Sequence, residues 1–272
     1  MQDGFFRYVG GKGGNSRKGD LARRILDELT RLAEELHGPW TFAEPFVGSG
    51  VIAANVVAGL RPNRVWLNDF DPAVAALHDV AIHHAAELCQ AVNATPKPTK
   101  EAFTRLQRQY KRCDYPDDPI QIALGKLLIQ QLGVSGRDRG MSNDQRWSHR
   151  SLITRVRRWE GLFAGKTNVT CRSFEKVITA HGRMLLYLDP PYPGKKGYQY
   201  DMTWNEHEQL ADLLRATRHP WVLSYGNKKA IRKLYDWATI QEVDAEYCMD
   251  GQMRKTIELI ITGSNGQKER KK

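Results

Sequence analysis

Two hydrophobic periods alternate along the chain. Behind Asp20, leucine and isoleucine recur every three or four residues as far as Leu36, which predicts an amphipathic helix. Short apolar runs typical of strands then alternate with helix-like segments, one over 51–60 and one opened by Pro72. The expected strands are 41–46, 64–69, 168–171, 184–188 and 221–225, with a late pair near 240–247 and 256–262. This alternation predicts an α/β fold, in which a mostly parallel sheet carries helices on both faces and binds ligands beyond the carboxyl ends of its strands.

The alternation stops in the middle of the chain. Two helices are expected near 101–111 and 120–132, and a segment rich in glycine, serine and arginine follows them. We therefore expect a core formed by residues 1–96 and 159–264, an inserted small helical subdomain of residues 97–158, and a basic, disordered tail of residues 265–272.

Composition narrows the class of protein. The 272 residues are 41% hydrophobic and 26% charged, which is the balance of a globular protein. The sequence lacks an apolar stretch near the ~18 residues of a membrane span and an apolar signal core, so we expect a soluble, cytoplasmic protein. The four cysteines lie far apart without a C-x-x-C pair, so we expect neither a metal site nor a disulfide framework.

Positive charge is concentrated in the expected insertion. The formal net charge is +10, and residues 97–158 carry 14 Lys or Arg against 6 Asp or Glu. A local excess of this size favours a polyanionic partner such as nucleic acid. The charged tail beyond residue 264 is more typical of a solvated chain end.

A glycine loop follows the first expected strand. The run EPFVGSGVIA, residues 44–53, matches the G-x-G-x-x-A fingerprint at Gly48, Gly50 and Ala53, and Asp69 ends the next strand 21 residues past Gly48. A carboxylate there can accept hydrogen bonds from a ribose, which indicates an adenosine cofactor, although Asp69 could instead cap the helix that Pro72 opens. A dinucleotide would place its pyrophosphate at the loop, where Glu44 is unfavourable; the cationic S-adenosylmethionine suits that carboxylate better.

The N-terminal run GGKGG, residues 10–14, is not a phosphate-binding P-loop. A P-loop ending at Lys12 needs glycine at position 6 and serine or threonine at position 13, where Phe6 and Gly13 stand. Its backbone N–H groups and one ammonium could hold a single carboxylate, such as the amino-acid end of the same cofactor; a disordered basic terminus is the alternative.

The tetrad Asp189-Pro190-Pro191-Tyr192 ends a strand at the edge where this architecture binds its ligands. Two prolines stiffen the loop and restrict the directions of its carbonyl groups. The Asp189 carboxylate and the Pro190 carbonyl can accept the two hydrogens of an aromatic amino group, while the Tyr192 ring stacks on the base. Such acceptors stabilise the positive charge that develops on nitrogen as it accepts a methyl group.

Four motifs together resemble a known family. FRYVGGKGG, FAEPFVGSG, LNDFDP and LDPPYP, in this order, are similar to the cofactor and catalytic motifs of the Dam-type (alpha-class) adenine-specific DNA methyltransferases, and the resemblance extends from residue 5 to about 235. It implies a Rossmann-like, seven-stranded methyltransferase fold and site-specific transfer of methyl from S-adenosylmethionine to the 6-amino group of adenine in duplex DNA. It also implies that the insertion holds much of the target recognition.

The resemblance carries roles onto individual residues. It implies cofactor contacts for Tyr8, Gly10, Gly11, Lys12, Glu44, Phe46, Gly48, Gly50 and Asp69, and a catalytic pocket for the flipped adenine at Asp189, Pro190, Pro191 and Tyr192. In one place the sequence departs from the family: Ser173 stands where an acidic residue often contacts the cofactor's adenine. Ser173 or Glu175 could make that contact, or it could be missing.

Contacts to DNA are expected from the insertion and from the loop after the tetrad, because a base inside a duplex must be extruded before it can react. The candidates are Arg137, Arg139, Asn143, Arg146, Trp147, Lys195 and Lys196. Residues 224–227 are a further candidate wall of the base pocket, with an ordinary loop as the alternative.

Alternative functions stay open at this level. They are methylation of the 4-amino group of cytosine, a catalytically silent DNA-binding regulator on the same fold, and an RNA substrate. The expected state is a monomer.

Overall fold

The computed structural model describes residues 5, 18–133, 147–194, 199–249 and 252–263. Its elements are α1 (Lys18–Ala33), β1 (Thr41–Glu44), α2 (Val51–Gly59), β2 (Arg64–Asn68), α3 (Pro72–His83), α4 (Ala85–Ala94), α5 (Lys100–Lys111), α6 (Pro119–Leu132), α7 (His149–Phe163), β3 (Thr167–Thr170), α8 (Phe174–Ile178), β4 (Met184–Leu188), α9 (Trp204–Ala216), β5 (Trp221–Gly226), α10 (Lys229–Leu234), β6 (Thr239–Met249) and β7 (Gln252–Gly263).

These strands form one seven-stranded sheet in the order β3-β2-β1-β4-β5-β7-β6. Five neighbouring strands pair in parallel, in the order β3, β2, β1, β4 and β5. Strand β7 runs antiparallel to both of its neighbours, β5 and β6. The predicted α/β fold with a mostly parallel sheet is confirmed. Because β1, β2 and β4 are adjacent and parallel, their carboxyl ends meet at one edge, where the candidate site lies.

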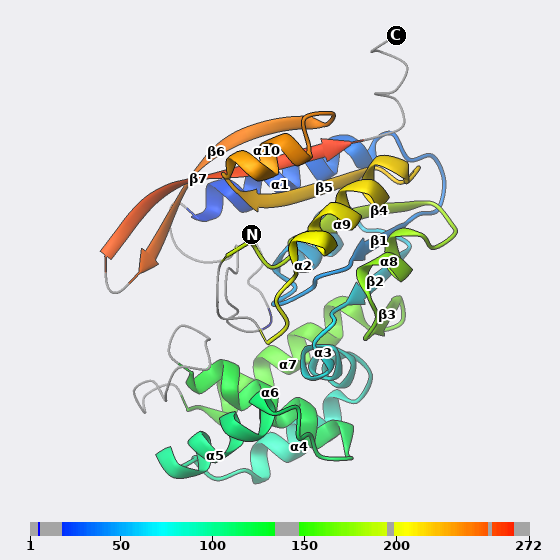
Figure 1. Cartoon of the computed structure of the whole chain (residues 1–272). Coiled ribbons are helices and arrows are strands. Elements are labelled where there is room, and N and C mark those ends of the chain that lie inside the picture. Colours follow the sequence, from blue (N-terminus) through cyan, green and yellow to red (C-terminus); the bar gives the residue numbers. More distant parts are fainter. Residues whose placement is uncertain (1–4, 6–17, 134–146, 195–198, 250–251, 264–272) are drawn as a thin grey trace.

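Helices cover both faces of the sheet (Figure 1). In β4, the Leu185 and Tyr187 side chains pack into a core with α1, α2, α3 and α7. The alternate residues Leu186 and Leu188 pack into a second core with α8, α9 and α10. Successive side chains of β4 therefore point into the cores on opposite faces of the sheet. This is why every residue of MLLYL is buried and apolar or aromatic.

The helices of the expected insertion pack beside α3 and share its core. Buried leucines of α6 and α7 belong to the same hydrophobic cluster as residues of α2 and α3. At Gly125 of α6, an added Cβ would lie 2.2 Å from the Tyr110 hydroxyl, so the glycine lets α5 approach closely. Helix α7 crosses residue 158. The division into a core and an insertion at 97–158 stays a prediction.

Helix ends follow local signals. Asp71 and Asp118 cap α3 and α6, each with proline in the first turn, and Thr203 and Glu206 form a capping box on α9. Helix α1 ends at Ala33, so Leu36 follows the helix on which periodicity had placed it. Among the described helices, none has the length and apolar character needed to cross a bilayer.

A candidate cofactor and substrate cavity

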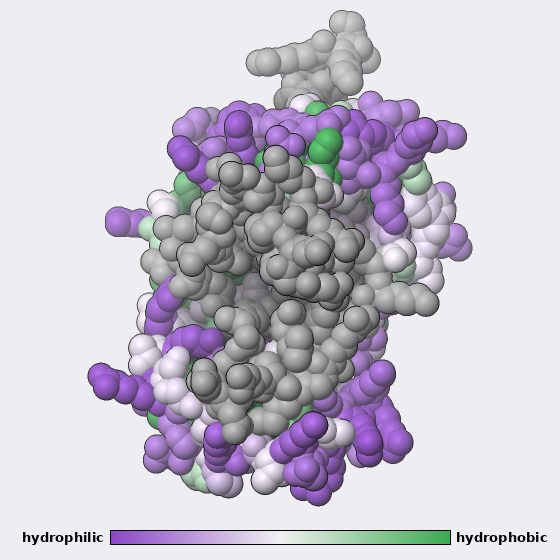
Figure 2. Space-filling view, turned by 90° about the vertical axis from the view of Figure 1, so that its left-hand side faces the viewer, coloured by the Kyte–Doolittle hydropathy of each residue, from purple (hydrophilic) through white to green (hydrophobic). Residues whose placement is uncertain are grey.

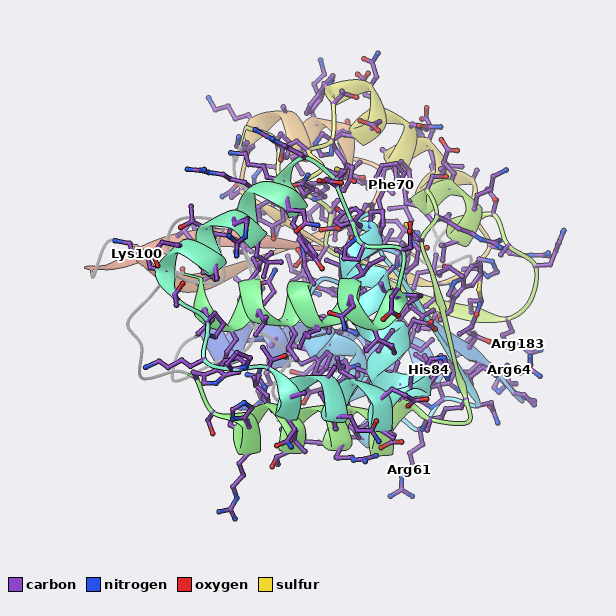
Figure 3. The ribbon with its side chains drawn as sticks, turned by 90° about the horizontal axis from the view of Figure 1, so that it is seen from below. Arg61, Arg64, Phe70, His84, Lys100 and Arg183 are labelled. Atoms are coloured by element: carbon purple, nitrogen blue, oxygen red, sulfur yellow. The ribbon has the colours of Figure 1, made fainter. Side chains whose placement is uncertain are left out.

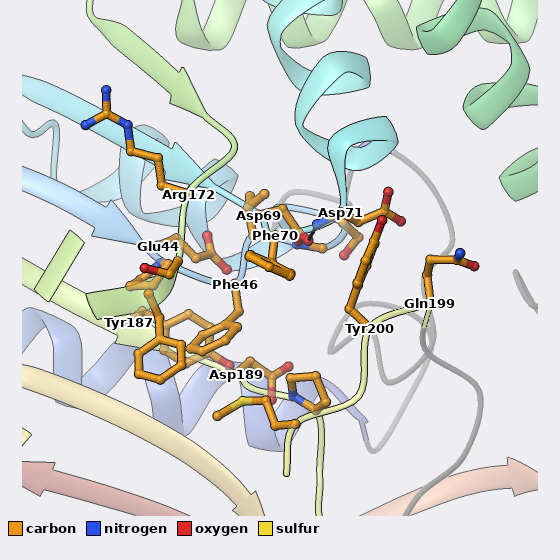
Figure 4. A pocket seen from close by; sticks show the side chains of 18 of the residues that line it. Glu44, Phe46, Asp69, Phe70, Asp71, Arg172, Tyr187, Asp189, Gln199 and Tyr200 are labelled. Atoms are coloured by element: carbon orange, nitrogen blue, oxygen red, sulfur yellow. Dashed lines mark hydrogen bonds between the residues drawn. The ribbon is translucent and has the colours of Figure 1, made fainter. Parts of the chain in front are cut away.

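A cavity opens at the carboxyl ends of β1, β2 and β4 (Figure 4). The loops after β1, β2, β3 and β4 line it. The structure brings together in its lining Glu44, Phe46, Gly48, Asp69, Asp189 and Pro191, all of which were predicted site residues. Segments far apart in the sequence therefore build one site.

The glycine loop turns tightly because two of its residues are left-handed. Gly48 and Gly50 have φ of 47° and 66°, and an added Cβ on Gly50 would lie 2.8 Å from the buried Trp159 ring. Gly50 is the N-cap of α2 and offers no side chain to its N–H groups. Glu44 supplies the missing acceptor, because its Oε2 accepts from the Ala53 N–H at 3.1 Å.

Glu44 is almost completely buried, with 3% of its surface exposed. Burial and the negative charges of Asp189 and Asp69 raise the pKa of this carboxyl well above its ordinary value, against the opposing Ala53 hydrogen bond. A cationic ligand in the cavity would favour the ionised form.

Asp69 points back into the glycine loop. Its Oδ2 accepts from the Gly48 N–H at 2.9 Å, and its Oδ1 accepts from the Asp71 N–H at 3.0 Å. Burial and the neighbouring Asp71 charge raise the pKa of Asp69 to about 6, although these hydrogen bonds and Lys126 oppose the shift. The helix cap is Asp71, whose Oδ1 accepts from Ala73 N–H at 2.9 Å. Asp69 therefore does not cap the helix, and the alternative considered for it is wrong.

The tetrad places its carboxylate in the cavity. Asp189 is half-buried, and its Oδ1 accepts a hydrogen bond of 2.8 Å from the Ser224 hydroxyl. The Tyr187 hydroxyl lies 3.0 Å from Ser224 Oγ, which completes a short polar row across β4 and β5. Ser224 was predicted only as part of a pocket wall; its contact with Asp189 appears once β5 pairs with β4.

The side chains of Pro190 and Tyr192 are buried and do not line the cavity. Pro190 is buried, and the Tyr192 ring is 6% exposed and packs against Tyr225 at 5.6 Å between ring centroids. Neither residue is among the described side chains of the lining. Stacking of Tyr192 on a base therefore stays a prediction that needs a movement of this ring.

Aromatic rings that the sequence reasoning missed surround the cavity. Phe174 packs beside Phe46 at 5.6 Å, and Tyr200 meets Phe70 edge-on at 5.3 Å. Phe70 is 54% exposed, so it lies at the mouth of the cavity with a free face. Its position between two aspartates in a turn was a signal for a ligand contact. Nothing in the sequence singled out Tyr200.

Negative charge dominates the lining. Its described acidic and basic side chains are the carboxylates of Glu44, Asp69, Asp71, Asp189, Asp201 and Glu206 and one cation, Arg172. Ser173 also lines the cavity, while Glu175 accepts a hydrogen bond from Gln209. The described residues contain no cluster of three or more His, Cys, Asp or Glu side chains able to hold a metal ion. The cavity thus suits an organic cation with a ribose, and these properties fit S-adenosylmethionine.

Several predicted contacts lie outside the described residues. They are Tyr8, Gly10, Gly11, Lys12, Arg137, Arg139, Asn143, Arg146, Lys195 and Lys196. The tail 265–272, predicted to be disordered, also lies outside the described residues. Trp147, a predicted DNA contact, is half-buried against the core and meets His149 edge-on at 5.0 Å.

The sequence model of the D12 class N6 adenine-specific DNA methyltransferases matches residues 17–249. The chain belongs to this family. It is accordingly a methyltransferase of Rossmann-like fold with S-adenosylmethionine as its cofactor. The predicted family is confirmed.

Other comparisons add distant similarities. A search of curated proteins gives no significant match. Precorrin-6y C5,15-methyltransferase from Geobacter metallireducens GS-15 is 8% identical, with TM-score 0.42 over 96% of this chain and 98% of that one. An rRNA methylase from Streptococcus thermophilus is 10% identical, with TM-score 0.38 over 93% and 100%. Trm1 from Pyrococcus horikoshii, in complex with S-adenosyl-L-methionine, is 10% identical, with TM-score 0.36 over 100% and 63%. None of these similarities bears on the substrate of this chain.

Proposed function

We propose that this methyltransferase acts on the 6-amino group of adenine in duplex DNA, at a specific site and after base flipping. The observation that carries the proposal is the position of Asp189: its carboxylate lies in the same cavity as Glu44 and Asp69, at the end of the adjacent strand. The cofactor and the reacting amino group can therefore share one space.

Each part of the cavity has a proposed role. Asp69 would accept the ribose hydroxyls on the lone pairs that its two amide contacts leave, and Glu44 would face the cationic end of the cofactor. S-adenosylmethionine, when bound, supplies an electrophilic methyl group. Phe70 and Phe174 would pack on flat rings at either side of this space.

Asp189 would act on the amino group itself. The exocyclic nitrogen is a weak nucleophile because its lone pair is delocalised into the base. A hydrogen bond from one of its N–H groups to Asp189 and one from the other to the Pro190 carbonyl would favour the pyramidal nitrogen. As the N–C bond forms, the bond between the methyl group and the cofactor's sulfur would break, with S-adenosylhomocysteine as the leaving group. The Asp189 carboxylate is placed to stabilise the positive charge on nitrogen, which would then lose one proton to water.

A basic stripe on α5 supports a polyanionic substrate. Arg105, Arg108 and Arg112, three exposed residues spaced along one face of α5, line a shallow groove and form no ion pair with described residues. We call these three residues the α5 arginine stripe. Helix α5 starts at Lys100, at the edge of the molecule, and runs toward the side of Phe70 (Figure 3).

The end of this stripe reaches the cavity mouth. Gln199 donates to the Lys111 carbonyl at 3.1 Å, and the Tyr200 hydroxyl lies 3.3 Å from Cys113 Sγ; Gln199 and Tyr200 both line the cavity. In Figure 2, hydrophilic side chains predominate at both ends of the described surface. A strand of DNA whose base enters the cavity could thus place its phosphates along the stripe.

A methylation assay tests the proposal. Purified protein, labelled S-adenosylmethionine and duplex DNA should give N6-methyladenine in the digested product, detected by mass spectrometry. Asp189→Ala should abolish the label while it retains S-adenosylhomocysteine binding. Asp79→Asn, a half-exposed carboxylate on α3, serves as the matched control and should remain active. Labelling of cytosine, labelling of structured RNA in preference to DNA, or an Asp189→Ala variant as active as the wild type would overturn it.

A further inference from the structure

A lysine of the inserted helices reaches the turn that carries Asp69. Lys126 lies in the apolar run of α6, with 11% of its side chain exposed, and its Nζ is 2.7 Å from Oδ2 of Asp71, whose side chain is 4% exposed. A buried ammonium is costly without an anionic partner, so this pair fixes α6 against the N-terminus of α3. Ala73 of α3, Tyr110 of α5 and Ile129 of α6 form a small apolar cluster beside it.

The ion pair continues into the cofactor cavity. Asp71 uses Oδ1 to accept from Ala73 N–H, and its own N–H donates to Oδ1 of Asp69 at 3.0 Å. Asp69 in turn holds the Gly48 N–H on Oδ2. One continuous row of polar contacts therefore runs from α6 through the β2–α3 turn to the glycine loop.

We propose that Lys126 is a positioning residue for the cofactor: from the inserted helices, it holds the turn 69–71 so that the Asp69 carboxylate faces the ribose. This inference rests on the proposed role of Asp69. Lys126 itself does not line the cavity, so any effect on the cofactor must pass through Asp71 and Asp69.

The charges around this turn predict the direction in which each substitution should shift the pKa of Asp69. Lys126 lowers the pKa of Asp69 and the Asp71 charge raises it, so the two partners of one ion pair act on Asp69 in opposite directions. The other titratable groups that feel the charges of Asp69 or Asp71 are Glu44, Tyr110, Cys113, Tyr115, Cys171 and Tyr200. His78 bonds to the Gly48 carbonyl, and burial lowers its pKa to about 4, so it stays neutral above pH 5.

Ionised Asp69 accepts the ribose hydroxyls better than the protonated acid does. Cofactor affinity should therefore be full above about pH 7 and should fall as the pH drops through the Asp69 pKa of about 6. Glu44 also titrates above its ordinary range, but the causes of its shift are burial, Asp189, Asp69 and the Ala53 N–H. A midpoint that responds to Lys126 thus reports on Asp69.

The experiment measures S-adenosylhomocysteine affinity by calorimetry from pH 5 to pH 8. In Lys126→Met the midpoint should move upward by about one pH unit, because a favourable charge is lost. In Asp71→Asn, which can still cap α3, it should move downward. Lys126→Arg, which keeps the charge, should leave it near the wild-type value. If the Lys126–Asp71 contact were merely structural, Lys126→Met and Asp71→Asn would both lower S-adenosylhomocysteine affinity, and their pH midpoints would not shift in opposite directions.

Two kinds of failure are distinguishable. If Asp69→Asn binds like the wild type with the same pH profile, the proposed cofactor site itself is wrong. If Asp69→Asn removes the transition but Lys126→Met and Asp71→Asn leave the midpoint in place, or move it in one direction, only the role of Lys126 is overturned. If circular dichroism shows that Lys126→Met does not fold, the Asp71→Asn variant decides. A downward shift of its pH midpoint supports the inference, and an unchanged midpoint overturns the inference.

Discussion

Replacing Ser224 with alanine removes the hydroxyl that donates to Asp189. The structure gives this contact as 2.8 Å, between a completely buried serine and a half-buried carboxylate, and Tyr187 contacts the same hydroxyl at 3.0 Å. We expect Ser224→Ala to leave the Asp189 side chain free to rotate out of the position in which it accepts an amino N–H.

The size of the effect follows from these contacts. A hydrogen bond to a charged group stabilises a fold by about 1.5–3 kcal/mol, so the free energy of unfolding should fall by about 2 kcal/mol. For a chain of this length that lowers Tm by roughly 3–4 °C. Loss of orientation at the reacting group should reduce kcat by about 10-fold to 100-fold. S-adenosylhomocysteine affinity should stay within about twofold, since Ser224 does not line the cavity.

Tyr187→Phe provides the matched control. It removes a hydroxyl from the same polar row but leaves the Ser224–Asp189 hydrogen bond in place. Its Tm should fall by a few degrees, while kcat stays within about threefold of the wild type. Single-turnover methylation of duplex DNA and thermal unfolding measure the two quantities. Ser224 does not orient Asp189 if Ser224→Ala is less stable but keeps the wild-type kcat. The same conclusion follows if Tyr187→Phe lowers kcat as much as Ser224→Ala does.

Three further predictions concern the loop, the buried histidine and the surface. Gly50→Ala should reduce the free energy of unfolding by about 2–4 kcal/mol in urea, because φ is +66° and the added Cβ meets Trp159; an unchanged urea midpoint would contradict this. The lowered pKa of His78, about 4 against 6.5 when unfolded, should contribute stability that is full above pH 6.5 and is lost, by about 3 kcal/mol, as the pH falls to 4. The free energy of unfolding of His78→Asn should lack this loss between pH 6.5 and pH 4. If the variant and the wild type lose stability equally over that range, His78 is not the cause. Serine at all three positions of the α5 arginine stripe should reduce the slope of log affinity for DNA against log salt by up to about 3, with S-adenosylhomocysteine affinity unchanged, whereas a wild-type slope would exclude a DNA contact there.

Local signals predicted most of the helices and strands. Pro72 after Asp71 marks the start of α3, and the fully apolar run of β4 marks a strand buried on both faces. No bounds were predicted for helices α4, α7, α8, α9 and α10. The position of β7 between β5 and β6 depends on pairing between distant segments, which no local pattern specifies.

The site was predicted where a motif coincides with a strand end. Glu44, Asp69 and Asp189 meet in one cavity because β1, β2 and β4 are neighbours. The Tyr192 ring packs on Tyr225 because side-chain direction depends on the packing that surrounds it. Lys126 escaped notice, since a lone lysine in a helix usually points to solvent, and only the contact between α6 and α3 shows that it is buried.

The placement of β7 has a consequence during synthesis on the ribosome. This strand is made after every other strand of the sheet, yet it fills the gap between β5 and β6. Until residues 252–263 leave the exit tunnel, the nascent chain exposes an unpaired β5 edge, which is a template for wrong strand pairing. Sheet closure therefore waits until residues 252–263 have been synthesised, and a chain that stops before them is prone to aggregation through the open β5 edge.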